Sequence, residues 1–157
     1  MFMDHLLPSR FFATSGKALS QVSSINAFDR ALMDAGIGEY NIVGVSSVLP
    51  KGIRKVKRID LPRGTILHCV LASMRGTGGE TISSGIAYAF RSDGQGGYVV
   101  EAHGHLDASS TRDLLRRKID EMASLRGIRI EKVEYVVEEI SVPMGSYGAC
   151  VAVLALF

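Results

Sequence analysis

Residues 25–50 read INAFDRALMDAGIGEYNIVGVSSVLP, a helical pattern followed directly by an apolar strand pattern. The first half predicts a helix over residues 26–36. Asn26 can cap its start, Asp29 suits the positive end of the helix dipole, and Gly36 fits a left-handed exit. The apolar face of this helix repeats at spacings of three and four residues and consists of Phe28, Ala31, Leu32 and Ala35.

Strand patterns make up most of the remaining chain. Residues 40–49 form an apolar run that Pro50 closes, and residues 128–142 alternate apolar with charged side chains. A second amphipathic helix is predicted over Ser110–Arg126. Further strands are predicted over residues 65–75, 81–90, 97–104 and 147–157, and over residues 10–14, where Ser15 and Gly16 would end the strand. Six or seven strands and two helices predict a single-domain α+β sandwich over residues 1–157.

Composition excludes several classes of protein. The chain has 157 residues, a net charge of +2, 46% hydrophobic residues and 22% charged residues, values that are typical of a globular domain and unlike a disordered chain. No apolar run approaches the roughly 20 residues of a membrane-spanning helix. The start, MFMDHLLPSRFF, contains Asp4 and Pro8 and is unlike a secretory signal. Cys69 and Cys150 are predicted to be buried free thiols, so we expect a cytoplasmic protein without a membrane partner.

Residues 51–63, KGIRKVKRIDLPR, form a basic segment with six Lys and Arg residues and one Asp. Such a segment can bind nucleic acid or another anionic partner. It contains no aromatic residue for base stacking, however, and the whole chain is nearly neutral. We therefore favour a solvated connection and expect no nucleic-acid partner.

Two other motifs are compared with known ligand sites. His103, His105 and Asp107 alternate along the chain and would share one face of a strand, which suits a divalent metal. Gly104 loosens that spacing and no fourth ligand follows, so we predict a turn into the next helix and no metal. Residues 76–80, GTGGE, lack the Gly-Lys-Ser/Thr ending of a phosphate-binding loop and predict a tight connection.

Ser46 and Ser47 are adjacent within an otherwise apolar segment. Two ordinary residues at the end of a strand are the simplest interpretation. A serine hydroxyl can also attack the carbonyl before it, if the backbone is strained and the oxyanion is stabilised, so that the peptide bond becomes an ester. β-Elimination then leaves dehydroalanine, and hydrolysis with loss of ammonia gives a pyruvoyl group at a new N-terminus.

The neighbourhood of this pair resembles the pyruvoyl-dependent arginine decarboxylase family. The resemblance rests on a helix beginning Asn-Ala-Phe-Asp at residues 26–29, an Ala-Gly-Ile-Gly exit at residues 35–38, Asn41, and the Ser-Ser pair before Val-Leu-Pro. Residues 79–83 (GETIS), Glu101 within YVVEAHG and the small-residue segment 148–156 are similar to that family as well. The likeness extends over most of the chain and is loosest in the basic segment.

The resemblance implies self-cleavage between Ser46 and Ser47, which gives a β chain of residues 1–46 and an α chain of residues 47–157. Ser47 would become the pyruvoyl cofactor, Ser46 would become a C-terminus, and Asn41 would assist by hydrogen bonding near the scissile carbonyl.

For catalysis, the resemblance implies that arginine forms a Schiff base with the pyruvoyl ketone, loses CO₂ and yields agmatine. Glu101 would return a proton to the α-carbon, and burial beside Tyr98–Val100 would favour its protonated form. On its residues alone, Glu101 could equally be an exposed strand charge. Asp29 would hold the guanidinium as a bidentate partner, and Leu32 would line the aliphatic part of the substrate.

The family fold is a four-layer αββα sandwich that forms trimers, or dimers of trimers, with each site built between protomers. Two alternatives stay open. The chain could decarboxylate another amino acid, histidine or aspartate, with the same cofactor. It could also be a trimeric scaffold or anion-binding protein that never cleaves.

Overall fold

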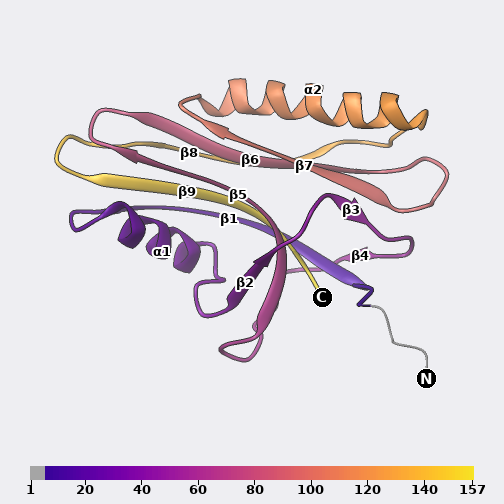
Figure 1. The fold of residues 1–157 in the computed structure, drawn as a ribbon, viewed down its shortest axis with the longest axis horizontal. Helices are drawn as coiled ribbons and strands as arrows, with labels where there is room; N and C mark the ends of the chain where they lie inside the picture. The colour runs from indigo at the N-terminus through magenta and orange to yellow at the C-terminus, as the bar shows by residue number, and fades with distance from the viewer. Residues whose placement is uncertain (1–5) are drawn as a thin grey trace.

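Two β-sheets pack face to face, and each carries one helix on the side away from the other sheet (Figure 1). The structure, a computed structural model, describes residues 6–157. In chain order the elements are β1 (Arg10–Ser20), α1 (Ser24–Asp34), β2 (Asn41–Gly44), β3 (Val48–Leu49), β4 (Arg54–Lys55), β5 (Ile66–Thr77), β6 (Thr81–Phe90), β7 (Gly97–Gly104), α2 (Ala108–Arg126), β8 (Glu134–Ser141) and β9 (Tyr147–Leu156). The chain is a single α+β domain, as the sequence predicts.

The larger sheet has the strand order β2-β5-β9-β1-β4, and the smaller sheet has the order β3-β7-β6-β8. β9 lies at the centre of the larger sheet and runs antiparallel to both β1 and β5. Every residue from 148 to 156 is buried, because one face of β9 meets the other sheet and the opposite face meets α1. Burial on both faces explains why this strand is apolar throughout rather than alternating.

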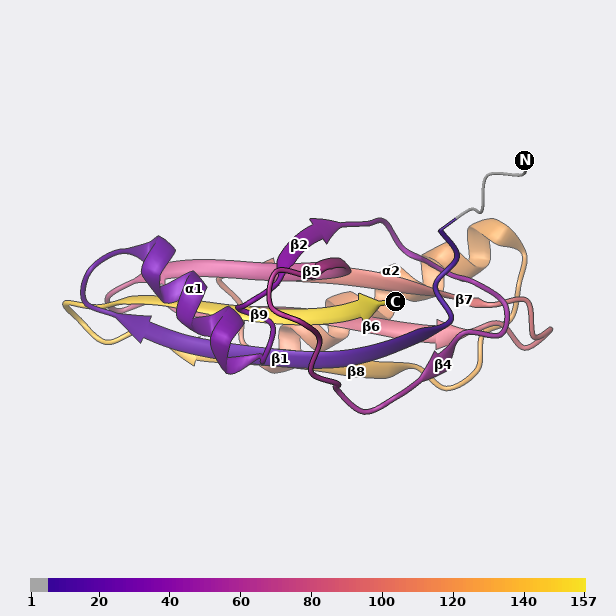
Figure 2. The same ribbon diagram turned by 90° about the horizontal axis from the view of Figure 1, so that it is seen from below.

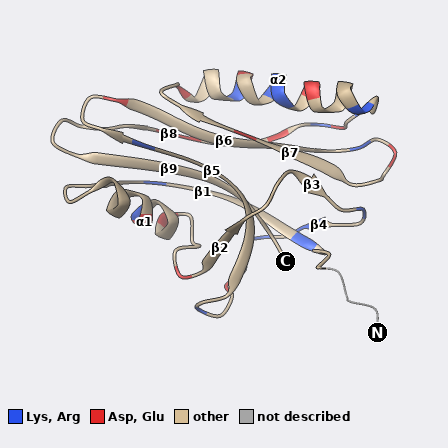
Figure 3. Ribbon diagram, in the orientation of Figure 1, with Lys and Arg blue, Asp and Glu red and all other residues tan. Residues whose placement is uncertain are grey.

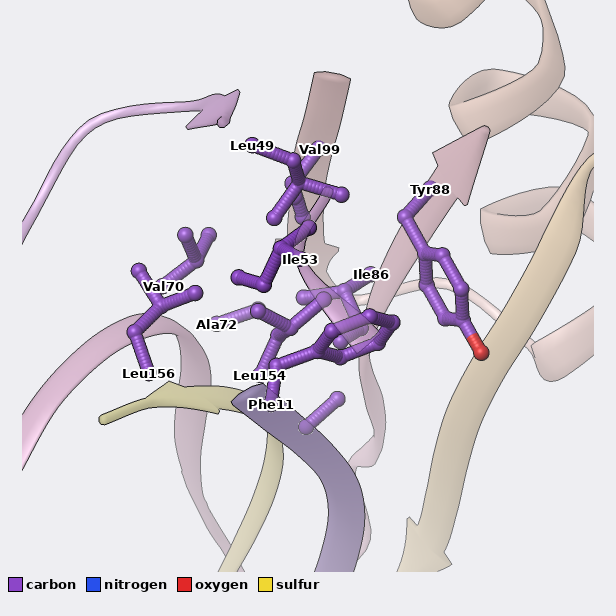
Figure 4. Close-up of a cluster of buried hydrophobic side chains, with 11 residues drawn as sticks. Phe11, Leu49, Ile53, Val70, Ala72, Ile86, Tyr88, Val99, Leu154 and Leu156 are labelled. Atoms are coloured by element: carbon purple, nitrogen blue, oxygen red, sulfur yellow. The ribbon is translucent and has the colours of Figure 1, made fainter. Parts of the chain in front are cut away.

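The space between the sheets is filled by side chains from both of them (Figure 4). The ring of Phe11 on β1 meets that of Tyr88 on β6 edge to face, with 5.4 Å between their centroids. The other members of this cluster are Leu49, Ile53, Val70, Ala72, Ile86, Val99, Ala152, Leu154 and Leu156. Leu49 is the last residue of β3 and Ile53 lies in the connection from β3 to β4, so the core also fixes the segment that follows the two serines.

Helix α1 lies across β1 and β9 on the outer face of the larger sheet (Figure 2). It begins two residues before the predicted position, because Ser23 and not Asn26 is the N-cap and its side chain accepts the N–H of Asn26. Asp29 therefore lies in the second turn, and the predicted contribution to the helix dipole from the first turn is wrong. The left-handed exit at Gly36 is confirmed by its φ of 79°.

Strand β1 does not end at Ser15 and Gly16 as predicted, but continues to Ser20. Gly16 is a position of close approach: a Cβ there would lie 2.2 Å from the carbonyl oxygen of Ala31 in α1. The predicted strand over residues 128–142 is regular only from Glu134 to Ser141. By contrast, β6 and β7 have the predicted bounds, and α2 ends at Arg126 as predicted, before a left-handed Gly127.

The basic segment is partly built into the fold, which corrects the expectation of a simple solvated connection. Its residues Arg54 and Lys55 form β4, which pairs in parallel with the start of β1, and Ile53 is buried in the core. Arg58 reaches back to α1, where its Nη1 donates to the carbonyl oxygen of Ala35 at 3.5 Å. Part of the positive charge of the basic segment therefore lies at the edge of the larger sheet and at the C-terminal end of α1, where basic side chains are common.

Cys69 and Cys150 are buried and free, as predicted. Burial raises the pKa of the Cys69 thiol to about 12 and also raises the pKa of the Cys150 thiol. No helix within residues 6–157 has the length and apolar character needed to cross a membrane. Asp4, one basis for expecting no secretory signal, lies outside the described residues.

Candidate active site at the Ser46–Ser47 peptide

The predicted strand over residues 40–49 is two strands in two different sheets. β2 pairs in parallel with β5 in the larger sheet, whereas β3 pairs with β7 in the smaller one. Figure 1 shows the chain passing from β2 up to β3, which lies beneath β7. Ser46 and Ser47 lie in this crossing segment, so the apolar run is divided at the two serines.

The peptide bond between the two serines lies between the last hydrogen bond to one sheet and the first to the other. The N–H of Val45 donates to the carbonyl oxygen of Cys69 at 2.9 Å, and the N–H of Val99 donates to the carbonyl oxygen of Ser47 at 2.9 Å. In a regular antiparallel ladder, Ser47 would return its own N–H to Val99. Within residues 6–157, neither the Ser47 N–H nor the Ser46 carbonyl oxygen has a protein partner.

A cavity of about 370 Å³ opens onto this peptide and brings together residues of the crossing segment, β5, β7 and α2. Ser46 and Ser47 come from the crossing segment, Glu101 from β7, and Lys118 from α2. The remaining lining residues are Val45, Val70, Val99, Val100, Glu121 and Met122. The structure thus places the predicted proton donor and the predicted cleavage pair around one space.

Glu101 is exposed, so the burial that its apolar neighbours suggested is wrong for the single chain. β3 pairs with β7 only at Gly97 and Tyr98, which leaves the later part of β7 as an open edge. Beyond that pairing, Glu101 and His103 are exposed, whereas Ala102 between them is buried.

A second cavity of about 500 Å³ adjoins the first at Val45 and Ser46. Its lining is mostly apolar, with His68 of β5 as its one titratable side chain among the described residues. The other lining residues are Leu6, Leu7, Pro8, Val48, Pro50, Leu156 and Phe157. The crossing segment therefore borders one cavity whose lining includes charged side chains and another whose lining is mostly apolar.

Asn41 lies at the first position of β2, where its Nδ2 donates to the carbonyl oxygen of Gly64 at 2.9 Å. Its backbone N–H donates to Thr65, so both contacts hold β2 against the connection that leads into β5. In the single chain, the hydrogen-bond partner of the Asn41 side chain is thus Gly64 and not the peptide between the serines.

Asp29 and Leu32 lie on α1 and do not line the cavity that contains Ser47. Asp29 is exposed, whereas Leu32 is half-buried and packs with the cluster beneath α1. The family resemblance assigns Asp29 and Leu32 to the same site as the serines, but within a single chain they lie on a different surface from the Ser47 cavity.

The motif at residues 103–107 forms a turn into a helix, as predicted. Asp107 is the N-cap of α2 and accepts the N–H of Ser110 at 2.7 Å. His105 pairs with Glu80, 3.2 Å away, in the tight connection between β5 and β6. Among residues 6–157, no three potential ligands are grouped in a way that could hold a metal ion.

α2 contributes Lys118, Glu121 and Met122 to the cavity, and sequence reasoning did not identify these residues as functional. They are spaced by three and four positions along the helix, so their side chains lie on the same side of it. The helix as a whole carries charges of both signs along its length (Figure 3). Helical spacing indicates that these side chains are neighbours. Only the tertiary fold shows that this side of α2 meets the open edge of β7.

The chain matches the family model of pyruvoyl-dependent arginine decarboxylase over residues 10–157. A pyruvoyl-dependent arginine decarboxylase of Methanothermobacter thermautotrophicus is 38% identical over 141 residues, which cover 88% of this chain and 90% of the relative. Those of Methanopyrus kandleri and Picrophilus torridus are 32% and 34% identical, and the matches cover 96% and 87% of this chain and 98% and 82% of the relatives. The chain therefore belongs to the pyruvoyl-dependent arginine decarboxylase family.

Proposed function

We propose that this protein cleaves its own backbone between Ser46 and Ser47 and then decarboxylates L-arginine to agmatine and CO₂. Membership of the family supports the reaction. The observation that carries the proposal is the Ser46–Ser47 peptide itself: among residues 6–157 it has no hydrogen-bond partner in the ladder of either sheet, and it faces a cavity lined by Glu101.

Cleavage begins with attack of Ser47 Oγ on the carbonyl carbon of Ser46, which converts the peptide bond into an ester and frees the Ser47 amine. The Cα of Ser47 then loses a proton while the Ser46 carboxylate leaves, so residue 47 becomes dehydroalanine. Water displaces ammonia from its tautomer, and a ketone results. No ladder hydrogen bond of the Ser46 carbonyl or the Ser47 N–H has to break first, which favours this route.

We propose that Asn41 supports cleavage by fixing the strand that leads to the serines. Its contacts with Gly64 and Thr65 hold the first residue of β2, and the last hydrogen bond of that strand is made by Val45, directly before Ser46. With β2 held at its start and β3 held by β7, the crossing segment is restrained at both ends.

Ser47 fits as the source of the pyruvoyl group for two reasons. It carries the hydroxyl that the reaction needs, next to a peptide bond that makes no ladder hydrogen bond within residues 6–157. It also lies at a cavity that Glu101 lines. The group would supply a ketone that forms a Schiff base with the α-amine of arginine and draws electrons from its α-carbon. Glu101 delivers the proton that the α-carbon takes up after CO₂ leaves.

We propose that Asp29 binds the guanidinium group and that Leu32 contacts the aliphatic part of arginine, both from a neighbouring protomer. Within one chain these residues lie on the outer helix, away from the Ser47 cavity. A trimer, or a dimer of trimers, of four-layer αββα protomers would complete the site. Asp29 is exposed, so its carboxylate is accessible to such a ligand.

The test is the decarboxylation of L-arginine by the purified protein, measured as CO₂ release and agmatine formation, with L-histidine and L-aspartate as competing substrates. We expect arginine to be turned over, and arginine with borohydride to leave a covalent adduct on the fragment that begins at residue 47. Ser47→Ala should remove both signals. Turnover of histidine or aspartate instead would overturn the choice of substrate, and a folded chain that forms no adduct would favour the non-cleaving scaffold.

We also propose the cytoplasm as the compartment, which the two buried free thiols support.

A further inference from the structure

β7 has an open edge beside the Ser46–Ser47 peptide. Its other edge pairs with β6 along its whole length, whereas β3 covers only Gly97 and Tyr98. Backbone groups of successive strand residues point to alternate sides, so those of Glu101 point to the same side as those of Val99. Val99 uses this side to hold the carbonyl of Ser47. The main chain of Glu101 therefore lies on the open edge, two residues beyond that contact.

Lys118 occupies this position on the open edge. Its Nζ extends from the middle of α2 and donates to the main-chain carbonyl oxygen of Glu101 at 2.7 Å. The same side chain lines the cavity that contains Ser46, Ser47 and Glu101. A charged donor makes a stronger hydrogen bond than a neutral one, and it ties the edge of the sheet to the helix above it.

The neighbouring basic residues of α2 do not share this arrangement. Arg116 pairs with Asp120 on the helix surface at 3.0 Å, and neither Arg116 nor Arg117 lines the cavity. Lys118 is thus the one basic residue in the lining of this cavity among the described residues.

We propose that Lys118 is a positioning residue for Glu101, one that holds the open edge of β7 so that the Glu101 carboxyl is fixed beside residue 47. The inference rests on the proposed function for its catalytic consequence, because a proton donor acts well only when its distance and direction are fixed. A simpler role is available, since lysines also shield exposed sheet edges. The two roles differ in what loss of the ammonium does to turnover.

The structural part is tested in the uncleaved Ser47→Ala chain by amide hydrogen exchange of the segment 98–104. Lys118→Met keeps most of the side-chain length and removes the charged donor. We expect it to speed exchange in this segment about fivefold or more, because a restraint on the edge is lost. Arg117→Met is the matched control and should leave the segment unchanged. Equal exchange in the Lys118→Met chain and its parent would overturn the inference.

The catalytic part is tested with the cleaving chain by measuring kcat and KM for arginine. We expect Lys118→Met to lower kcat about 10-fold to 100-fold, since displacing a catalytic group by about 1 Å can cost about 100-fold. KM should stay within about threefold, because Asp29 carries the contact with the guanidinium. Lys118→Arg keeps a charged donor and should recover most of the lost turnover, which mere shielding of an edge does not predict.

Three results would overturn the inference while leaving the proposed function intact: a kcat for Lys118→Met within twofold of the parent, a rise in KM without a fall in kcat, or a folded Lys118→Met chain that fails to cleave. The last would assign Lys118 to processing rather than to turnover. An unmodified chain that neither cleaves nor decarboxylates arginine would overturn the proposed function, and the catalytic part of the inference would fall with it.

Discussion

Replacement of Gly16 by alanine should separate α1 from the sheet that supports it. A Cβ at this position would lie 2.2 Å from the carbonyl oxygen of Ala31 and 2.6 Å from the backbone nitrogen of Ala35. Both atoms belong to the main chain around α1, so no side-chain rotation relieves the contact. The helix would have to withdraw by roughly 1.3 Å to restore an ordinary separation of about 3.5 Å.

The size of the effect follows from how closely α1 is packed. Ala27, Ala31 and Ala35 are fully buried, so the helix rests on its smallest side chains and any withdrawal opens a gap along its length. Overpacking in a core costs about 1–3 kcal/mol, and here the clash is with backbone. We expect Gly16→Ala to lower the free energy of unfolding by about 2–3 kcal/mol.

The assay is urea unfolding in the Ser47→Ala background, where one intact chain unfolds, at a fixed protomer concentration. Gly44→Ala is the control, because a Cβ at Gly44 would meet nothing within 4 Å. We expect the control to stay within about 0.5 kcal/mol of its parent. A Gly16→Ala chain that is equally unaffected would refute the account of how α1 is seated.

The remaining predictions concern substrate binding, pH and thiol chemistry. Asp29→Asn should raise KM for arginine about tenfold or more while backbone cleavage proceeds normally, because one charge of a bidentate pair is lost; kinetics and intact masses measure the two effects, and an unchanged KM would contradict the assignment. Hydrogen bonds from the backbone N–H and the hydroxyl of Ser110 lower the pKa of Asp107, so its contribution to stability is complete above its ordinary pKa of 3.8 and is lost as the pH falls through the lowered value. Asp107→Asn should therefore flatten the acid side of a plot of stability against pH, and an unaltered slope would contradict this. Burial raises the pKa of Cys69 to about 12 and also raises that of Cys150, so iodoacetamide at pH 8 should label neither thiol until denaturant is added. Rapid labelling of the folded protein would show that the thiols are accessible.

The local sequence correctly predicted the bounds of those elements whose ends are marked by turn residues. β6 and β7 begin and end where expected, and α2 ends before Gly127, because glycines at these ends adopt positive φ values that other residues rarely adopt. Gly16 misled the prediction because a glycine that ends a strand and one that admits a neighbouring backbone look alike in sequence.

The apolar run over residues 40–49 shows a different limit. Its hydrophobicity indicates burial, but a strand of one sheet and a strand of the other sheet show the same apolar residue pattern. The division at Ser46 and Ser47 depends on partners in β5 and β7 that are distant in sequence. The two serines and Glu101 were found through resemblance to a family, whereas Lys118 could not be, since the edge that it contacts exists only after the sheet has formed.

The intact mass of the purified protein under denaturing conditions tests the central claim most directly. We predict two fragments, one ending at residue 46 and one beginning at residue 47, with the larger lighter by one ammonia than simple hydrolysis would leave. Ser47→Ala should remain a single chain under the same conditions. A folded, unmodified protein that keeps one unbroken mass after long incubation, or whose larger fragment begins with an ordinary serine, would contradict the account.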